Sequence, residues 1–205
     1  MMTLTVDSLV KRFEKKSVLK DLSFSFQTPV LGISGSNGSG KSTLLRCLTG
    51  LLKPTSGSVL WSVDSFTYNP KQIKPLLGFS APYVELYEEL TISENLNFLF
   101  DLQNKTIHKG IKDHLTFFEA EDFINSQYGH LSTGQQQRVK LAAATINSPS
   151  ILVLDEPGSN LDLAGKEIIK NLVKRFRDEE KMVLIASNLS EELSLCDKIL
   201  DLNNQ

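Results

Sequence analysis

Apolar and polar residues alternate in two segments near the N-terminus, 4–10 and 22–26, with the period of half-buried strands. The charged stretch EKKS lies between them, so the two segments predict an antiparallel β start. From residue 30 the pattern changes, because VLGIS runs into a glycine-rich turn and then into STLLRCLTGLL, where leucines recur at helical spacing. This stretch predicts a strand, a loop and a helix whose apolar stripe is formed by Leu44, Leu45, Leu48, Leu51 and Leu52.

A second helical region is predicted to begin near Thr91. Thr91 and Glu94 have the spacing of a capping box before an apolar run, and residues 91–128 are expected to be mostly helical. Two continuous apolar runs, 151–154 and 182–186, predict buried parallel strands. A helix with one apolar face is expected between them, and that face is formed by Ile168, Ile169, Leu172, Val173 and Phe176.

Together these elements predict an α/β fold in one domain that spans residues 1–205. Its core has a mainly parallel sheet, preceded by an antiparallel β lobe. A helical subdomain is expected to be inserted in this core at about residues 75–145.

Composition narrows the classes of partner. The formal net charge is −2 and like charges do not cluster, so no nucleic-acid partner is expected. The apolar runs are far shorter than the roughly 20 residues that span a bilayer, and the N-terminus does not have the pattern of a secretory signal. We therefore expect a cytoplasmic protein whose role at a membrane, if any, requires a partner chain.

The stretch 35–42, GSNGSGKS, matches the P-loop pattern GxxxxGK[ST] between a predicted strand and a predicted helix. Backbone N–H groups of such a loop surround phosphate oxygens, and the dipole of the following helix attracts the anion. Lys41 is expected to reach the β- and γ-phosphates, and Ser42 to give its hydroxyl to Mg²⁺. A flexible glycine-serine loop is the alternative. The predicted ATP-binding residues of this stretch are Ser36, Asn37, Gly38, Ser39, Gly40, Lys41, Ser42 and Thr43.

An apolar strand that ends in two adjacent carboxylates follows at 151–157, ILVLDEP. In P-loop proteins the first acid, here Asp155, orients the magnesium shell, and a following glutamate, here Glu156, can polarise the attacking water. The alternative is a solvated strand end before a proline turn.

The segment 131–139, LSTGQQQRV, resembles the LSGGQ signature of the ABC ATPases, with Thr133 in place of the first of the paired glycines. Asp155 follows Gln135 by 20 residues, and SNLD at 159–162 resembles the D-loop of the same family. With these motifs in this order, the chain is similar to an ABC cassette over nearly its whole length. The resemblance implies that Ser132, Gly134 and Gln135 bind the γ-phosphate of an ATP held by the opposite subunit, and hence a dimer.

Phe13 and Val18 lie where this family contacts adenine. The resemblance implies that Phe13 stacks on the base and that Val18 flanks it. Packing at a strand end is the alternative for Phe13.

Two positions depart from the family pattern. Pro82 stands where the family has a glutamine that contacts Mg²⁺ and the water, and Asn188 stands where a histidine contacts the γ-phosphate. The three histidines are expected on the surface, away from this role, and they are His108, His114 and His130. Because Lys41 and Glu156 remain, the resemblance implies ATP binding with slow hydrolysis, with Asn188 as a weaker catalytic contact.

Four apolar residues surround the position of the missing glutamine, and they are Phe79, Tyr83, Leu86 and Tyr87. The resemblance implies that this patch receives a short helix from a membrane subunit. A place in the core of the helical subdomain is the alternative for each of them.

The resemblance implies the nucleotide-binding subunit of an ABC transporter, which would bind MgATP, dimerise with an identical or different cassette and drive separate transmembrane subunits. It would then lie peripherally on the inner face of the cell membrane. A non-transport ABC ATPase of DNA repair, chromosome organisation or translation is the alternative. Only 90 residues separate Lys41 from Leu131, which leaves no room for a long coiled coil, and the chain has one cassette. A P-loop kinase or GTPase would leave LSTGQ unexplained.

Overall fold

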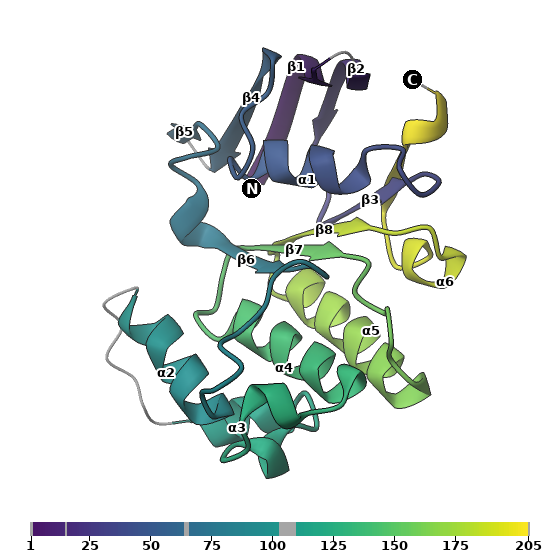
Figure 1. The fold of residues 1–205 in the computed structure, drawn as a ribbon. Coiled ribbons are helices and arrows are strands. Elements are labelled where there is room, and N and C mark those ends of the chain that lie inside the picture. The colour runs from purple at the N-terminus through teal and green to yellow at the C-terminus, as the bar shows by residue number, and fades with distance from the viewer. Residues whose placement is uncertain (1, 15, 64–65, 103–109, 205) are drawn as a thin grey trace.

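Two β-sheets and the helices packed against them organise the chain, and the computed structural model describes residues 2–14, 16–63, 66–102 and 110–204 (Figure 1). The first sheet is the predicted antiparallel β lobe, with strand order β2-β1-β4-β5. Its strands are β1 (Met2–Phe13), β2 (Lys16–Phe26), β4 (Ser56–Val63) and β5 (Phe66–Tyr68). The alternating pattern at the N-terminus therefore formed the expected antiparallel pair, with Leu4 opposite Phe26.

The second sheet is parallel, with strand order β6-β7-β8-β3-β9. Every residue of its two central strands β7 and β8 is buried, which explains why their sequences are continuous apolar runs. The strands are β3 (Val30–Ser34), β6 (Leu77–Ser80), β7 (Ile151–Asp155), β8 (Met182–Ala186) and β9 (Lys198–Asp201).

Helix α1 (Lys41–Leu48) lies between the two sheets, as Figure 1 shows, and its leucines pack into the hydrophobic core that both sheets share. The helix ends at Leu48. It is therefore shorter than predicted, since the expected apolar stripe extended through Leu51 and Leu52. Gly50, with φ 70°, takes the left-handed conformation that ends helices. Leu51 then lies outside the helix with 53% of its surface exposed.

Helices α4 and α5 cover the opposite face of the parallel sheet, and α2 and α3 pack beside them in a second hydrophobic core (Figure 1). Helix α2 begins as predicted, because Thr91 accepts a hydrogen bond from the N–H of Glu94, and the Glu94 carboxylate accepts one from the N–H of Thr91. The helices beyond α1 are α2 (Ile92–Asp101), α3 (Ile111–Thr116), α4 (Thr133–Thr145), α5 (Leu163–Asp178) and α6 (Ser190–Leu193). Short 3₁₀ turns form at Lys74–Leu76, Glu121–Phe123, Tyr128–His130 and Leu202–Asn204.

The described part of residues 91–128 is mostly helical, as predicted, but its helices are short. Helix α3 has only six residues, and the backbone after it turns at Glu119, which has φ 50°. The interval 75–145, predicted as the inserted subdomain, also contains β6, an edge strand of the parallel sheet. The helical part of the interval therefore begins with α2.

The expectation that the histidines lie on the surface fails for His114, which is partly buried within the helical region. Its Nε2 lies 2.9 Å from the carbonyl oxygen of Ala142 on α4, and its ring packs against Phe118. His130 is exposed as expected, and His108 lies outside the described residues. Among the described helices, none is long and apolar enough to cross a membrane.

Candidate nucleotide-binding site

The P-loop connects β3 to α1 and forms a cradle of backbone groups. Gly38 has φ 80° and Gly40 has φ 106°, backbone conformations that residues with a side chain rarely adopt. Lys41 is buried, and its ammonium group donates hydrogen bonds to the carbonyl oxygens of Gly35 at 2.8 Å and Ser36 at 3.3 Å. The lysine is thereby held across the loop at the start of the helix, where the positive dipole end attracts an anion.

Asp155 ends β7 beside this cradle and is 1% exposed. Burial raises the pKa of its carboxyl group above the ordinary value, and the neighbouring Glu156 charge adds to this effect, whereas Ser42, Lys41 and Arg46 oppose it. Ser42 lies close enough to influence the carboxylate, yet neither oxygen of Asp155 has a hydrogen bond of normal geometry from a described residue. A buried, unsatisfied carboxylate beside a serine hydroxyl offers the hard oxygen ligands that Mg²⁺ prefers.

Glu156 follows at the rim of the site. Its backbone has φ 48°, a conformation uncommon for a residue with a side chain, and its N–H donates to the carbonyl oxygen of Ala186 at 2.8 Å. Its carboxylate lies 3.8 Å from the Lys41 ammonium group. The turn therefore holds this carboxylate beside the cradle, where it could accept a proton from a water molecule.

The P-loop forms a hollow with a volume of 450 Å³, which suits a small ligand. Its lining combines the loop with Glu156 and with Val18 of β2, whose contact with the base stays a prediction. The lining residues are Val18, Asn37, Gly38, Gly40, Lys41, Ser42, Thr43 and Glu156.

Three other predicted residues lie near this hollow without lining it. Ser36 and Ser39 line an adjoining hollow of 260 Å³ on the other side of the loop. Phe13 is 46% exposed at the end of β1, and the Lys11 ammonium group lies 4.9 Å from its ring centroid. Phe13 therefore does not lie in the core, and its stacking on adenine stays a prediction.

Strand β8 ends at Ala186, as the apolar run 182–186 predicted, and Ser187 follows it. Ser187 is buried, and its hydroxyl accepts a hydrogen bond from the N–H of Leu189. Asn188 is exposed, and its amide donates to the Asn37 side chain of the P-loop at 3.3 Å. The structure thus brings Asn188 to the P-loop although it does not belong to the strand.

The signature segment forms the N-terminus of α4. The Ser132 hydroxyl accepts from the N–H of Gln135 at 3.4 Å, and the Gln135 side chain accepts from the N–H of Ser132 at 2.9 Å, which completes a capping box. Gly134 lies in the first turn beside Asn160 of the predicted D-loop. Ser132 is exposed, and the signature residues do not line the P-loop hollow of their own chain.

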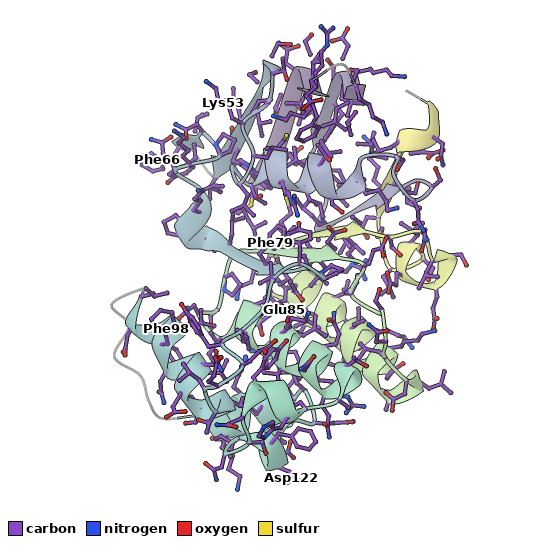
Figure 2. All side chains as sticks on the ribbon, viewed as in Figure 1. Lys53, Phe66, Phe79, Glu85, Phe98 and Asp122 are labelled. Carbon is purple, nitrogen blue, oxygen red and sulfur yellow. The ribbon has the colours of Figure 1, made fainter. Side chains whose placement is uncertain are left out.

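The four apolar residues around position 82, which the sequence predicted to form one patch, have different neighbours. The rings of Phe79 and Tyr83 have centroids 6.2 Å apart, whereas Tyr87 packs edge-on against Phe98 of α2 at 5.4 Å. Phe79 and Leu86 line a groove of 270 Å³ between β6, α2 and α4, and Figure 2 shows Phe79 at the sheet and Phe98 on α2.

Three residues that the motifs did not indicate also belong to the surroundings of the site. Gln137 of α4 donates a buried hydrogen bond to the carbonyl oxygen of Pro157 at 2.8 Å and so joins the signature helix to the loop after Glu156. Glu192 of α6 accepts from the N–H of Gly158 at 2.8 Å, and burial raises its pKa. Arg46 stacks on Tyr83 at 3.7 Å. Because these contacts join segments far apart in the sequence, no local pattern could have shown them.

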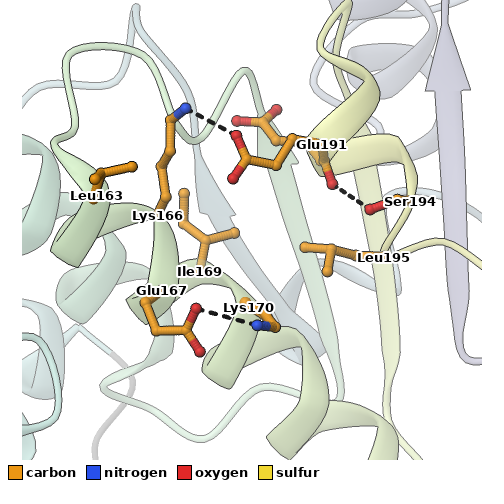
Figure 3. A pocket seen from close by; sticks show the side chains of 9 residues that line it. Leu163, Lys166, Glu167, Ile169, Lys170, Glu191, Ser194 and Leu195 are labelled. Atoms are coloured by element: carbon orange, nitrogen blue, oxygen red, sulfur yellow. Dashed lines mark hydrogen bonds and ion pairs between the residues drawn. The ribbon is translucent and has the colours of Figure 1, made fainter.

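Another hollow, of 380 Å³, lies between α5 and α6 and is lined in part by Glu192. Figure 3 shows the Lys166 ammonium group of α5 reaching across it to the Glu191 carboxylate of α6, at 2.8 Å. This ion pair is exposed, so it contributes little to stability. It fixes α6 against the helix that follows the predicted D-loop.

A parallel sheet with a P-loop after β3, a buried acid at the end of β7 and an antiparallel β lobe defines the class of P-loop nucleotide-binding folds. The profile of the family described as "ABC transporter" matches residues 19–159. The chain is 34% identical to the ABC transporter ATP-binding protein NatA of Bacillus subtilis, over 98% of this chain and 85% of that protein.

Solved structures agree with this match. The dimeric structure of MJ0796, a bacterial ABC transporter cassette, has a TM-score of 0.84 at 26% identity and covers 97% of this chain and 93% of its own. A dimeric post-hydrolysis state of the same cassette, bound to ADP and Pi, has a TM-score of 0.85 at 27% identity, with the same two coverages. The chain belongs to the ATP-binding cassettes of the ABC transporter family.

Proposed function

We propose that the chain is the ATP-hydrolysing subunit of an ABC transporter and drives separate transmembrane subunits by ATP-dependent dimerisation. One observation carries the proposal most directly: a buried lysine and a rim glutamate line the P-loop hollow, and an unsatisfied buried aspartate lies beside Ser42 of the same lining. The relatives and solved structures that match are transporter ATP-binding proteins and cassettes, which favours transport over the alternative of a non-transport ABC ATPase.

Each residue of the site would have its own role in binding or hydrolysis. Lys41 and the loop N–H groups would hold the phosphates, Phe13 and Val18 the base. Ser42 and Asp155 would hold Mg²⁺, which supplies charge neutralisation when bound. Glu156 is placed to orient water and take its proton, and Asn188 to donate one hydrogen bond to a phosphate oxygen.

We expect the signature segment to contact a second nucleotide, which is held by an opposing cassette. Ser132, Gly134 and Gln135 lie at the exposed start of α4 and outside the hollow of their own chain. They would reach the γ-phosphate held by an opposing cassette, which supports a homodimer or heterodimer.

We expect the groove beside α2 to bind the membrane partner. It is lined by apolar side chains that include Phe79, Leu86 and the exposed Leu102, which is suited to an amphipathic helix. Such docking would hold the chain peripherally at the inner face of the membrane.

Two measurements test the proposal. MgATP turnover of the purified chain is compared with that of Lys41→Ala, which should lose ATP binding. Affinity purification from detergent-solubilised membranes should recover a polytopic membrane protein. Recovery of a nucleoprotein in its place would support the non-transport alternative, and absence of ATP binding would contradict both.

A further inference from the structure

The peptide unit that joins Pro157 to Gly158, directly after Glu156, is held from both sides by buried side chains. Its carbonyl oxygen, which belongs to Pro157, accepts a hydrogen bond from the Gln137 side chain at 2.8 Å. Its N–H, which belongs to Gly158, donates to the Glu192 carboxylate at 2.8 Å. Gln137 is 7% exposed and Glu192 is 6% exposed. Because both bonds are shielded from water, loss of either side chain leaves a buried polar group of this peptide unsatisfied.

The two side chains that hold this clamped peptide come from different helices. Gln137 belongs to α4, whose N-terminus is the signature segment. Glu192 belongs to α6, the short helix that follows Asn188. The turn after Glu156 is therefore fixed by two helices that flank the nucleotide site, and not by its own sequence alone.

Gly158 makes the close approach of Glu192 possible. A Cβ atom at position 158 would overlap Oε1 of the Glu192 carboxylate, so a residue with a side chain would push the carboxylate away. Burial raises the pKa of this carboxyl group, which means that the surroundings favour its neutral form. A neutral amide in the same place should therefore be tolerated and should still accept the hydrogen bond.

The clamped peptide determines where the Glu156 side chain lies. The N–H of Ser159 donates to the carbonyl oxygen of Glu156 at 3.2 Å, and the N–H of Glu156 donates to the carbonyl oxygen of Ala186 at 2.8 Å. Glu156 has φ 48° in this turn, a conformation that a residue with a side chain keeps only where its surroundings hold it. Release of the peptide would let the turn relax and would move the Glu156 carboxylate from its place 3.8 Å from the Lys41 ammonium group.

We propose that Gln137 and Glu192 are positioning residues for hydrolysis, which hold the Pro157–Gly158 peptide and thereby direct the Glu156 carboxylate toward the attacking water. Neither residue is among those that line the P-loop hollow, so both act through Glu156 and not on the nucleotide. The inference rests on the proposed hydrolysis of ATP.

The main test is Glu192→Ala, which removes the acceptor of the Gly158 N–H. A misplacement of about 1 Å in a catalytic group can cost about 100-fold in rate, so kcat should fall at least about tenfold. KM and the nucleotide affinity should stay unchanged, because the P-loop still holds the phosphates. Glu192→Gln keeps an acceptor oxygen and should restore most of the turnover. Glu191→Ala is the matched control, because Glu191 is the neighbouring residue on α6 and forms an exposed ion pair with Lys166 (Figure 3).

Two further variants reach the same peptide by other routes. Gly158→Ala leaves Glu192 in the chain but displaces its carboxylate, and Gln137→Met removes the donor on the other side with little change in side-chain size. Each should lower kcat while the nucleotide affinity stays unchanged. A general loss of fold would instead lower the temperature of thermal unfolding and weaken ATP binding together with kcat.

Hydrogen exchange of the Gly158 amide gives a readout that does not depend on turnover. It should be faster in Glu192→Ala than in the wild type, and unchanged in Glu191→Ala. A kcat in Glu192→Ala equal to that of the wild type, or a loss in Glu192→Gln as large as in Glu192→Ala, overturns the proposal. A wild-type chain without turnover contradicts the proposed hydrolysis. Unchanged exchange in Glu192→Ala would then separately overturn the hold on the peptide.

Discussion

We expect the Asn188 side chain to limit the rate of hydrolysis at a site whose other predicted residues are in place. Its amide reaches the P-loop at Asn37, and the buried Lys41 and the carboxylates of Asp155 and Glu156 are all in place. A neutral, short amide can donate only one hydrogen bond to a phosphate oxygen, so it stabilises developing charge less than a histidine would.

We therefore expect Asn188→His to raise kcat of MgATP hydrolysis roughly tenfold, below the 10²- to 10³-fold cost of losing a whole transition-state donor. ATP affinity should stay unchanged, since the loop holds the ground state. Steady-state kinetics with a separate nucleotide-binding assay measure both. Asn188→Gln, which changes length without adding an imidazole, is the control. An equal or lower rate in Asn188→His would show that Asn188 does not limit hydrolysis.

His114 gives the helical region a dependence on pH. Its pKa in the folded chain is lowered, mainly by burial, whereas the bond to the Ala142 carbonyl partly opposes this shift. As the pH falls through the ordinary histidine value of about 6.5, the unfolded chain takes up a proton that the folded chain does not. The free energy of unfolding should therefore decrease from about pH 7 to about pH 5.

His114→Gln should make that part of the pH profile shallower, because it removes this difference in proton uptake. Urea titrations at several pH values give the free energy of unfolding, and His130→Gln at an exposed position is the matched control. A profile in His114→Gln as steep as in the wild type would assign the acid sensitivity to other groups.

Residue-scale prediction from sequence worked where a motif is local. The P-loop and the acids after β7 converge in the structure because the strand and helix around them leave the chain few alternatives. It failed where the environment comes from distant segments. Nothing next to His114 in the sequence shows that Ala142 will cover it, and nothing next to Tyr83 shows that Arg46 will stack on it.

At the scale of elements, we expect a membrane subunit to contact the groove between β6, α2 and α4. Leu102 lines it and is 64% exposed, so its loss should not disturb the core. Leu102→Glu should reduce co-purification of the membrane partner at least about tenfold, as expected for an interface anchor, while MgATP binding stays intact.

Phe66→Glu is the matched control, because Phe66 is 68% exposed on β5 in the other lobe, as Figure 2 shows. Quantitative immunoblotting of the membrane partner after affinity purification measures the effect. Equal recovery with Leu102→Glu and the wild type would show that the groove is not the docking surface. A simultaneous loss of nucleotide binding would show that Leu102 supports the fold.

Elements whose apolar residues recur with a clear period were predicted well, and irregular elements were not. The two apolar runs became β7 and β8, and the one-sided pattern became α5, because buried parallel strands and a surface helix have characteristic sequences. The breaks within the helical region were not predicted, since the short helices and 3₁₀ turns there are stabilised by packing against α4 and α5 rather than by local propensity.

At the scale of the whole molecule, the position of the signature away from the P-loop hollow of its own chain predicts nucleotide-dependent association. Glu156→Gln should accumulate a dimer in MgATP, because it removes the carboxylate beside Lys41 that drives turnover while the binding residues remain. Gel filtration should show an approximately doubled apparent mass.

Glu156→Gln combined with Lys41→Ala should stay monomeric under the same conditions, because the phosphate ligand is lost. If Glu156→Gln alone remains monomeric at saturating MgATP, this chain does not pair with itself. A dimer that forms without nucleotide would exclude ATP as the component that joins the two copies.

The edges of the parallel sheet restrict how copies of this protein can associate. Strand β6 at one edge has only four residues and lies between Pro75 and Pro82, and β9 at the other edge is equally short and has charged residues at both ends, Lys198 and Asp201. Short, charged or proline-flanked edge strands resist pairing with the backbone of another molecule. Pro82, which has no backbone N–H to donate, thus also protects the molecule against edge-to-edge aggregation.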